Sequence, residues 1–232
     1  MRFFPFAAAK TCLLCHDFVN KNVCDGCLGD LLSLSCQQNR HCPRCGGKGD
    51  GQTECGACQQ TPPPFAKLHA SFYYDTPLRG VLHHFKHRRA LFYAPVFADL
   101  MMQRTPTWLA TAKIDAVLPM PLSRERLLER GFNQSAELLR CLAVHFSWTV
   151  LPEDAVCRRH AVPQSTLPFA ERQNNVKGIF SVNFDVKKRN LLLIDDVFTS
   201  GASLRELART LKKSGAGEIF AWTLARSQVK NF

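Results

Sequence analysis

The stretch LLLIDDVFTSGAS, residues 191–203, decides the fold. Its four consecutive apolar residues, Leu191 to Ile194, are typical of a strand that is buried in a parallel sheet. Two adjacent acids follow, Asp195 and Asp196, and then a loop of small residues leads into a helical pattern. A strand, a glycine-containing loop and a helix in this order predict one unit of an α/β domain.

The same stretch carries polar groups that suit a sugar phosphate. The free amides, the hydroxyl groups and the positive dipole at the start of a helix favour a phosphate, and carboxylates at the carboxyl edge of a sheet can accept hydrogen bonds from ribose hydroxyls. Two neighbouring carboxylates at a buried strand end repel each other, so their presence needs a reason. The candidate ligand residues here are Asp195, Asp196, Thr199, Ser200, Gly201, Ala202 and Ser203.

A second constellation follows residues 114–118, which are apolar except for Asp115 and predict another buried strand. Arg130 has the fork geometry that binds phosphate, and Asn133 is a suitable cap for the next helix. Arg124 and Arg126 are explained nearly as well by a solvated basic helix. The candidate ligand residues of this region are Pro121, Leu122, Arg130, Asn133 and Gln134.

The rest of the second part of the chain alternates between strand and helix patterns. Strands are expected at 67–74, 114–118, 191–194 and 219–224, and helices after Pro77 and over 94–102, 135–146 and 204–213. This alternation predicts an α/β fold with a parallel sheet and helices on both faces.

Cysteines dominate the first part of the chain. Nine of the eleven lie between Cys12 and Cys58, and four Cys-x-x-Cys units supply eight ligands for two closed, structural zinc sites. Pairing neighbouring units costs less loop-closure entropy, although a cross-braced pairing is also open. Cys36 fits no unit. The predicted metal ligands are Cys12, Cys15, Cys24, Cys27, Cys42, Cys45, Cys55 and Cys58.

Composition separates the chain into unequal parts. The predicted divisions are a zinc-ribbon-like module over residues 1–60, a proline-rich linker over 61–66 and an α/β domain over 67–232. The formal net charge is +11, of which residues 1–66 contribute only +1, so the α/β domain is suited to an anionic partner. We expect a cytoplasmic protein without a membrane span, because the apolar runs are short and the cysteines suit a reducing compartment.

Residues 191–203 resemble the signature of type I phosphoribosyltransferases, which bind 5-phosphoribosyl-1-pyrophosphate (PRPP). The resemblance implies a type I phosphoribosyltransferase-like fold. It also implies that Asp195 and Asp196 hold the ribose 2′- and 3′-hydroxyls, and that Thr199 to Ser203 bind the 5′-phosphate. The loop that begins at Pro119 would bind the pyrophosphate, and Mg²⁺ would accompany PRPP. Phe198 is bulkier than the aliphatic residue usual at its position.

The whole of residues 10–227 resembles the ComF/GntX family, which is linked to competence and the handling of incoming DNA. The shared features are the Cys-x-x-Cys units, the acid pair, Phe85-Lys86, Pro121-Leu122, residues 130–134, Gln164, Leu167, Arg172, Asn175 and Phe180. The resemblance implies a hood over the PRPP site, formed by residues 164–180, with Gln164, Arg172 and Asn175 as its candidate ligand residues. Met120 and Ile179 depart from the usual residues without removing a polar group.

Three functions follow from this resemblance. The first is a PRPP-binding accessory protein that handles incoming single-stranded DNA with other competence proteins, and Lys86, Arg88 and Arg89 are the candidate DNA contacts. The second is an active phosphoribosyltransferase with an unknown acceptor, for which the sequence assigns no catalytic residue. The third is a scaffold with PRPP as effector. The last two differ in whether PRPP is consumed.

Overall fold

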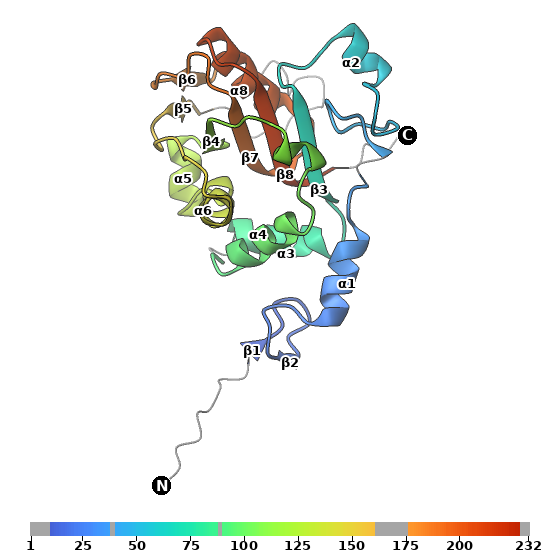
Figure 1. The fold of residues 1–232 in the computed structure, drawn as a ribbon. Helices are drawn as coiled ribbons and strands as arrows, with labels where there is room; N and C mark the ends of the chain where they lie inside the picture. Colours follow the sequence, from blue (N-terminus) through green and yellow to red (C-terminus); the bar gives the residue numbers. More distant parts are fainter. Residues whose placement is uncertain (1–9, 38–39, 88–89, 161–175, 228–232) are drawn as a thin grey trace.

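The computed structural model describes residues 1–232 except for 1–9, 38–39, 88–89, 161–175 and 228–232. Its centre is a four-stranded, fully parallel sheet in the order β3-β8-β7-β4 (Figure 1). The strands are β3 (Lys67–Tyr73), β4 (Ala116–Pro119), β7 (Leu191–Phe198) and β8 (Ile219–Arg226). The predicted α/β class with a parallel sheet is confirmed.

Helices cover both faces of the sheet (Figure 1). Leu192 and Ile194 of β7 point into one core, together with residues of α3, α4 and α6, whereas Leu191 and Leu193 point into the other core, with α8. This alternation explains why the strand reads as an unbroken apolar run. The helices are α3 (Leu78–His87), α4 (Tyr93–Met102), α6 (Gln134–Phe146) and α8 (Ala202–Lys213).

The strand β7 is longer than the sequence predicts. The prediction ended the strand at Ile194, but β7 continues to Phe198 because β8 pairs with it along this length. Asp195 lies opposite Thr223, and Phe198 lies opposite Arg226. The two acids are therefore fixed within the strand and not in the loop that follows it.

Several short elements escaped the sequence patterns. They include α5, which has no fully buried residue, and strands of only two or three residues, which are too short to show a period. These elements are β1 (Lys10–Thr11), β2 (Phe18–Val19), α1 (Asp25–Ser33), α2 (Gly56–Gln60), α5 (Arg124–Arg130), β5 (Val156–Arg158), β6 (Phe180–Val182) and a 3₁₀ turn, η2 (Thr107–Ala110).

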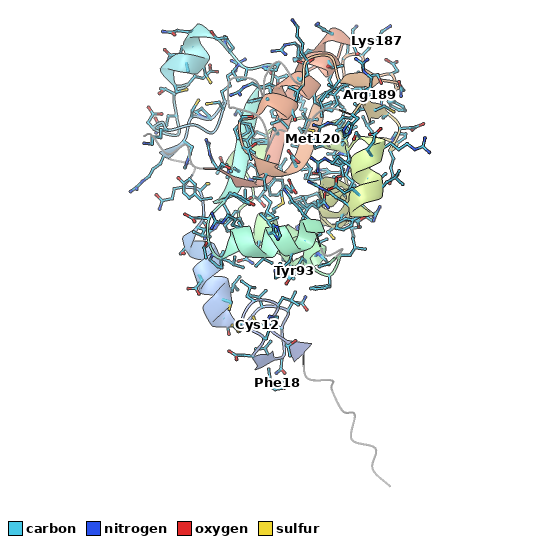
Figure 2. The ribbon with its side chains drawn as sticks, turned by 180° about the vertical axis from the view of Figure 1, so that it is seen from behind. Cys12, Phe18, Tyr93, Met120, Lys187 and Arg189 are labelled. Atoms are coloured by element: carbon cyan, nitrogen blue, oxygen red, sulfur yellow. The ribbon has the colours of Figure 1, made fainter. Side chains whose placement is uncertain are left out.

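The cysteine-rich segment packs on the α/β domain at two separate places. Cys12 and Leu31 join the core beneath α4, and the Tyr93 hydroxyl donates to the Leu13 carbonyl at 3.1 Å. Figure 2 shows Cys12 on the Tyr93 side of the molecule and Phe18 beyond it. Farther along the chain, the Leu68 amide of β3 donates to the Pro43 carbonyl at 3.4 Å. The boundary at residues 61–66 stays a prediction.

Candidate functional site

The acid pair forms the floor of a pocket at the carboxyl end of β7. The Ser135 hydroxyl donates to Asp195 Oδ1 at 2.9 Å, and the Asp196 amide donates to the same oxygen at 2.9 Å. Burial, and then the charge of Asp196, raise the pKa of Asp195 to about 7 against the weaker opposite effects of Ser135 and Lys86. Lys86 Nζ lies 2.8 Å from Asp196 Oδ2, which pairs the second carboxylate.

The small-residue loop ends in a sharp turn at the start of α8. Gly201 is the N-cap residue and has a left-handed backbone with φ 73°. A Cβ on Gly201 would lie 2.4 Å from Phe198 Cζ, so no larger residue fits there without a rearrangement. The Ala202 amide donates to Ser200 Oγ at 3.4 Å, and Ser200 thus caps the turn. Phe198, the unusual residue of this stretch, therefore shapes the glycine turn directly.

A second loop brings two buried donors to the pocket. Gly131 ends α5 with a left-handed backbone, and Asn133 caps α6 by accepting from the Ser135 and Ala136 amides. Arg130 Nη1 donates to Gln134 Oε1 at 2.9 Å. Arg130 Nε and Gln134 Nε2 are buried without a hydrogen-bond partner among the described residues. Buried donors of this kind need an acceptor, which an anionic ligand would supply.

Asn133 holds α6 and the loop after β4 together. Besides capping α6, as predicted, it donates through Nδ2 to the Met120 carbonyl at 3.0 Å and so ties α6 to the loop after β4. Pro121 and Asn133 line a neighbouring cavity of about 500 Å³ and not the pocket of the acid pair. Leu122 and Arg158 line both cavities, which therefore adjoin.

Arg158 is a pocket residue that the sequence analysis missed. Its guanidinium donates to the Pro121 carbonyl and to Ser203 Oγ, each at 3.4 Å, and lies 5.5 Å from the centre of the Phe180 ring. Burial lowers the pKa of Arg158 even though Asp195 opposes the effect. One cation thus bridges the loop after β4 and the loop before α8.

Lys86 lies in the same pocket, although the sequence placed it in a basic cluster for DNA. It is only partly exposed and pairs with Asp196. The other two members of that cluster, Arg88 and Arg89, lie outside the described residues, as do Gln164, Arg172 and Asn175 of the expected hood.

The pocket has a volume of about 310 Å³. Four cationic side chains line it, those of Lys86, Arg126, Arg130 and Arg158, against the two acids. The structure brings most of the predicted ligand residues together here. They are Leu122, Arg130, Gln134, Asp195, Asp196, Thr199, Gly201, Ala202 and Ser203.

The cysteines form two groups whose geometry fits zinc. In each group all four Sγ atoms lie within 4.8 Å of one another. The Sγ atoms of Cys15 and Cys24, and those of Cys45 and Cys55, are 3.7 Å apart, close to the ~3.8 Å edge of a tetrahedron with Zn–S bonds of ~2.3 Å. The pairing of neighbouring units is confirmed, and the groups are Cys12, Cys15, Cys24 and Cys27, and Cys42, Cys45, Cys55 and Cys58.

The two groups are built alike, and we call them the first and the second knuckle. The Cys24 amide donates to Cys12 Sγ at 3.3 Å, and the Cys55 amide donates to Cys42 Sγ at 3.2 Å. Burial opposes ionisation of both acceptor thiols, but the amide hydrogen bonds outweigh it and lower the pKa of Cys12 to about 6 and of Cys42 to about 7. One thiol of each knuckle is thus favoured as the thiolate that a metal ion requires. Burial raises the pKa of other members, such as Cys27 and Cys58, so a bound cation is needed to ionise the whole group.

Two further residues of the cysteine-rich part lie outside both groups. Cys36 is buried, and burial raises the pKa of its thiol to about 12. The His41 ring hydrogen-bonds to the Tyr73 hydroxyl through Nε2 at 2.8 Å, so it is engaged with β3. Within the part of the chain that the structure describes, no helix has both the length and the apolar character needed to cross a bilayer.

Solved structures that match part of this chain include the hypoxanthine phosphoribosyl transferase of Trypanosoma cruzi. It is 14% identical, covers 61% of this chain and 66% of its own length, and has a TM-score of 0.37. No protein-family model matches the chain.

Sequence relatives give a closer comparison. The DNA utilization protein YhgH of Escherichia coli K12 is 31% identical over 193 residues, which cover 80% of this chain and 84% of that protein. Competence protein F of Haemophilus influenzae is 28% identical over 98% of this chain and its own full length. Competence protein ComFC of Bacillus subtilis is 34% identical over 48% of this chain and 44% of its own. On this similarity, the chain belongs to the ComF family.

Proposed function

We propose that this protein binds PRPP in the acid-pair pocket and assists the handling of incoming single-stranded DNA in the cytoplasm. The named relatives support the second part, because they are competence proteins and a DNA utilization protein. The pocket supports the first part through its chemistry.

The observation that carries PRPP binding is that two acids share one pocket with two buried donors that have no partner among the described residues, one on a guanidinium and one on a side-chain amide. Gln134 is only 1% exposed, yet its Nε2, like Arg130 Nε, has no partner among the described residues. Both line the pocket that also contains Asp195 and Asp196. A ligand that satisfies both kinds of group must offer anionic oxygens at one end and hydroxyl donors at the other. A sugar phosphate has this composition.

The proposed orientation of PRPP matches each of its parts to one set of these groups. The 5′-phosphate would accept hydrogen bonds at the α8 N-terminus, from the amides and hydroxyls of residues 199–203. The ribose hydroxyls would donate to Asp195 and Asp196, and the pyrophosphate would meet Arg130. Mg²⁺ bound with PRPP would neutralise part of the pyrophosphate charge, and carboxylate oxygens are ligands that this ion accepts. Arg158, which contacts both loops, would interact with the ligand between its two charged ends.

Calorimetric titration with PRPP, with and without Mg²⁺, tests the proposal. The wild type is expected to bind, and the Asp195→Asn/Asp196→Asn variant is expected to lose about tenfold or more in affinity, because two charge-assisted hydrogen bonds weaken. Asp30→Asn, an exposed acid on α1, is the matched control and should bind like the wild type. A folded wild type that shows no heat of binding with PRPP would contradict the proposal.

The DNA part of the proposal predicts a salt-dependent interaction. Residues 67–232 contribute +10 to the formal charge, so single-stranded DNA is expected to bind mainly through its phosphates. The affinity for a fluorescent oligo(dT), measured by anisotropy, should fall by about tenfold or more between roughly 50 and 200 mM salt. Binding that does not respond to salt, or no binding at the lower concentration, would argue against direct contact with DNA.

A further inference from the structure

Three side chains form a row across the carboxyl end of the sheet. Tyr73 of β3 lies opposite Arg226 of β8, and Arg226 lies opposite Phe198 of β7. Residues directly opposite each other on neighbouring strands point to the same face of a sheet, so the three side chains are neighbours. The row runs from the second knuckle at one end to the loop before α8 at the other.

The second knuckle rests on this row. A Cβ on Gly46, which follows Cys45, would lie 2.9 Å from Arg226 Nη1 and 2.8 Å from Leu68 Cδ2. Gly46 also has a left-handed backbone, with φ 64°. Just before the knuckle, the His41 ring meets the Tyr73 hydroxyl at 2.8 Å. The backbone that carries Cys45 is therefore packed against Arg226 with no space for a side chain between them.

At the opposite end of the row, Phe198 contacts residues 199–203, which we call the phosphate loop. The Phe198 ring has the guanidinium of Arg226 at 5.9 Å from its centre and that of Arg205 at 6.0 Å. These distances fall within the range of cation–π attraction. The same ring fills the space beside Gly201, the N-cap of α8, and the Ser227 amide donates to the Phe198 carbonyl at 2.9 Å. A shift of the ring would therefore displace the turn that forms the phosphate end of the pocket.

Arg226 is held mainly by packing. Its Nη1 is buried and has no hydrogen-bond partner among the described residues. A cavity of about 20 Å³ lies beside it, bounded also by Cys36, His41 and Gly46, which is room for a single water. Since no acceptor in the described part of the chain fixes this end of the guanidinium, we infer its position from the knuckle and the Phe198 ring that contact it.

We propose that Arg226 is a positioning residue that couples the metal-loaded second knuckle to the phosphate loop. When the knuckle holds its metal, the backbone at Gly46 keeps Arg226 against Phe198, and Phe198 keeps the Gly201 turn in its binding geometry. Loss of the metal frees the knuckle backbone, and the loop loosens. The first knuckle packs beneath α4, within the core on the other face of the sheet, and takes no part in this coupling. The expected change in PRPP affinity rests on the proposed function, whereas the expected change in hydrogen exchange does not.

Two measurements on the full-length protein test the coupling. Hydrogen exchange of the amides in residues 197–204 should speed up by about tenfold in Arg226→Gln and in Cys45→Ser, which removes the second metal ion. The PRPP affinity of both variants should fall by a similar factor. The Arg226→Gln/Cys45→Ser double variant should lose no more PRPP affinity than either single variant, because both changes interrupt the same coupling. Arg226→Lys keeps a cation over the ring and should recover most of the affinity.

Arg189→Gln is the matched control. Arg189 stacks on Phe184 with its guanidinium 5.3 Å from the ring centre, and it precedes β7 at the other end of the strand. Removing this pair should leave exchange in residues 197–204 unchanged. Additive losses of PRPP affinity in the double variant would overturn the inference. So would unchanged hydrogen exchange of residues 197–204 in a Cys45→Ser protein that has lost one zinc ion. If the wild type fails to bind PRPP, the proposed function falls, while the exchange data still decide the coupling.

Discussion

Removing the metal from the first knuckle is expected to unfold residues 12–33 and to lower the Tm by about ten degrees or more. The four sulfurs of this knuckle lie within 4.8 Å of one another, and without a cation their thiolates would repel. Structural zinc supplies on the order of 10 kcal/mol in small domains. Cys12 and Leu31 also belong to the core beneath α4, so the loss extends into the α/β domain.

Cys24→Ser is the sharpest variant for this measurement. Cys24 is both a member of the metal group and the N-cap of α1, where its Sγ accepts from the Cys27 amide. Thermal unfolding followed by circular dichroism, together with zinc analysis, should show one ion lost and the lower Tm. Cys157→Ser is the control, because Cys157 is exposed and lies outside both groups. A Cys24→Ser protein that loses one ion and keeps its Tm would contradict the expectation.

Asp195 is expected to make stability fall as pH rises from about 4 to about 7. Burial and Asp196 raise the pKa of Asp195 from 3.8 to about 7, so the folded protein binds a proton that the unfolded chain releases. Asp195 therefore contributes stability that is fully present below its pKa in the unfolded chain, about 3.8, and that is lost as the pH rises through its pKa in the folded protein, about 7. The Asp195→Asn variant removes the ionisation, and its Tm advantage over the wild type should grow by several degrees between about pH 5 and pH 8.

Ser135→Ala gives a directional check on this expectation. The Ser135 hydroxyl donates to Asp195 Oδ1 and lowers its pKa, so removing the hydroxyl should move the stability change to higher pH. Differential scanning calorimetry across the pH range would measure both variants. A Tm difference between Asp195→Asn and the wild type that does not change with pH would show that Asp195 titrates as an ordinary acid.

The parts of the structure that local patterns control were predictable from the sequence. Residues 191–194 are typical of a buried parallel strand, and the glycine turn and the helical pattern that follow them support this prediction without reference to another part of the chain. Metal ligands at Cys-x-x-Cys spacing were equally local, because two residues of separation fix how two sulfurs meet one ion. Even here, the strand continued to Phe198 because β8 supplied partners that no local pattern reveals.

Long-range contacts account for what the sequence did not show. Arg158 and Arg159 are adjacent in the sequence, yet Arg158 reaches Ser203 in the pocket whereas Arg159 donates to the Gly178 carbonyl. The strand β5 is only three residues long and ends at Arg158, and so short a pattern does not distinguish one arginine from the other. Lys86 read as part of a basic surface cluster because its partner, Asp196, is more than a hundred residues away.

In each knuckle, the residue that follows the second cysteine, which we call the corner, has the same backbone conformation. The two corners differ in how readily they accept another side chain. His16 and Gly46 both have φ 64°, and their amides donate to the carbonyls of Cys12 and Cys42 respectively. The exposed corner at residue 16 already carries an imidazole, so only backbone preference limits its replacement. At residue 46 even a methyl group would collide with Leu68 and Arg226. Residue 16 can therefore vary without a steric clash, whereas any side chain at residue 46 would first have to displace the side chains of Leu68 and Arg226.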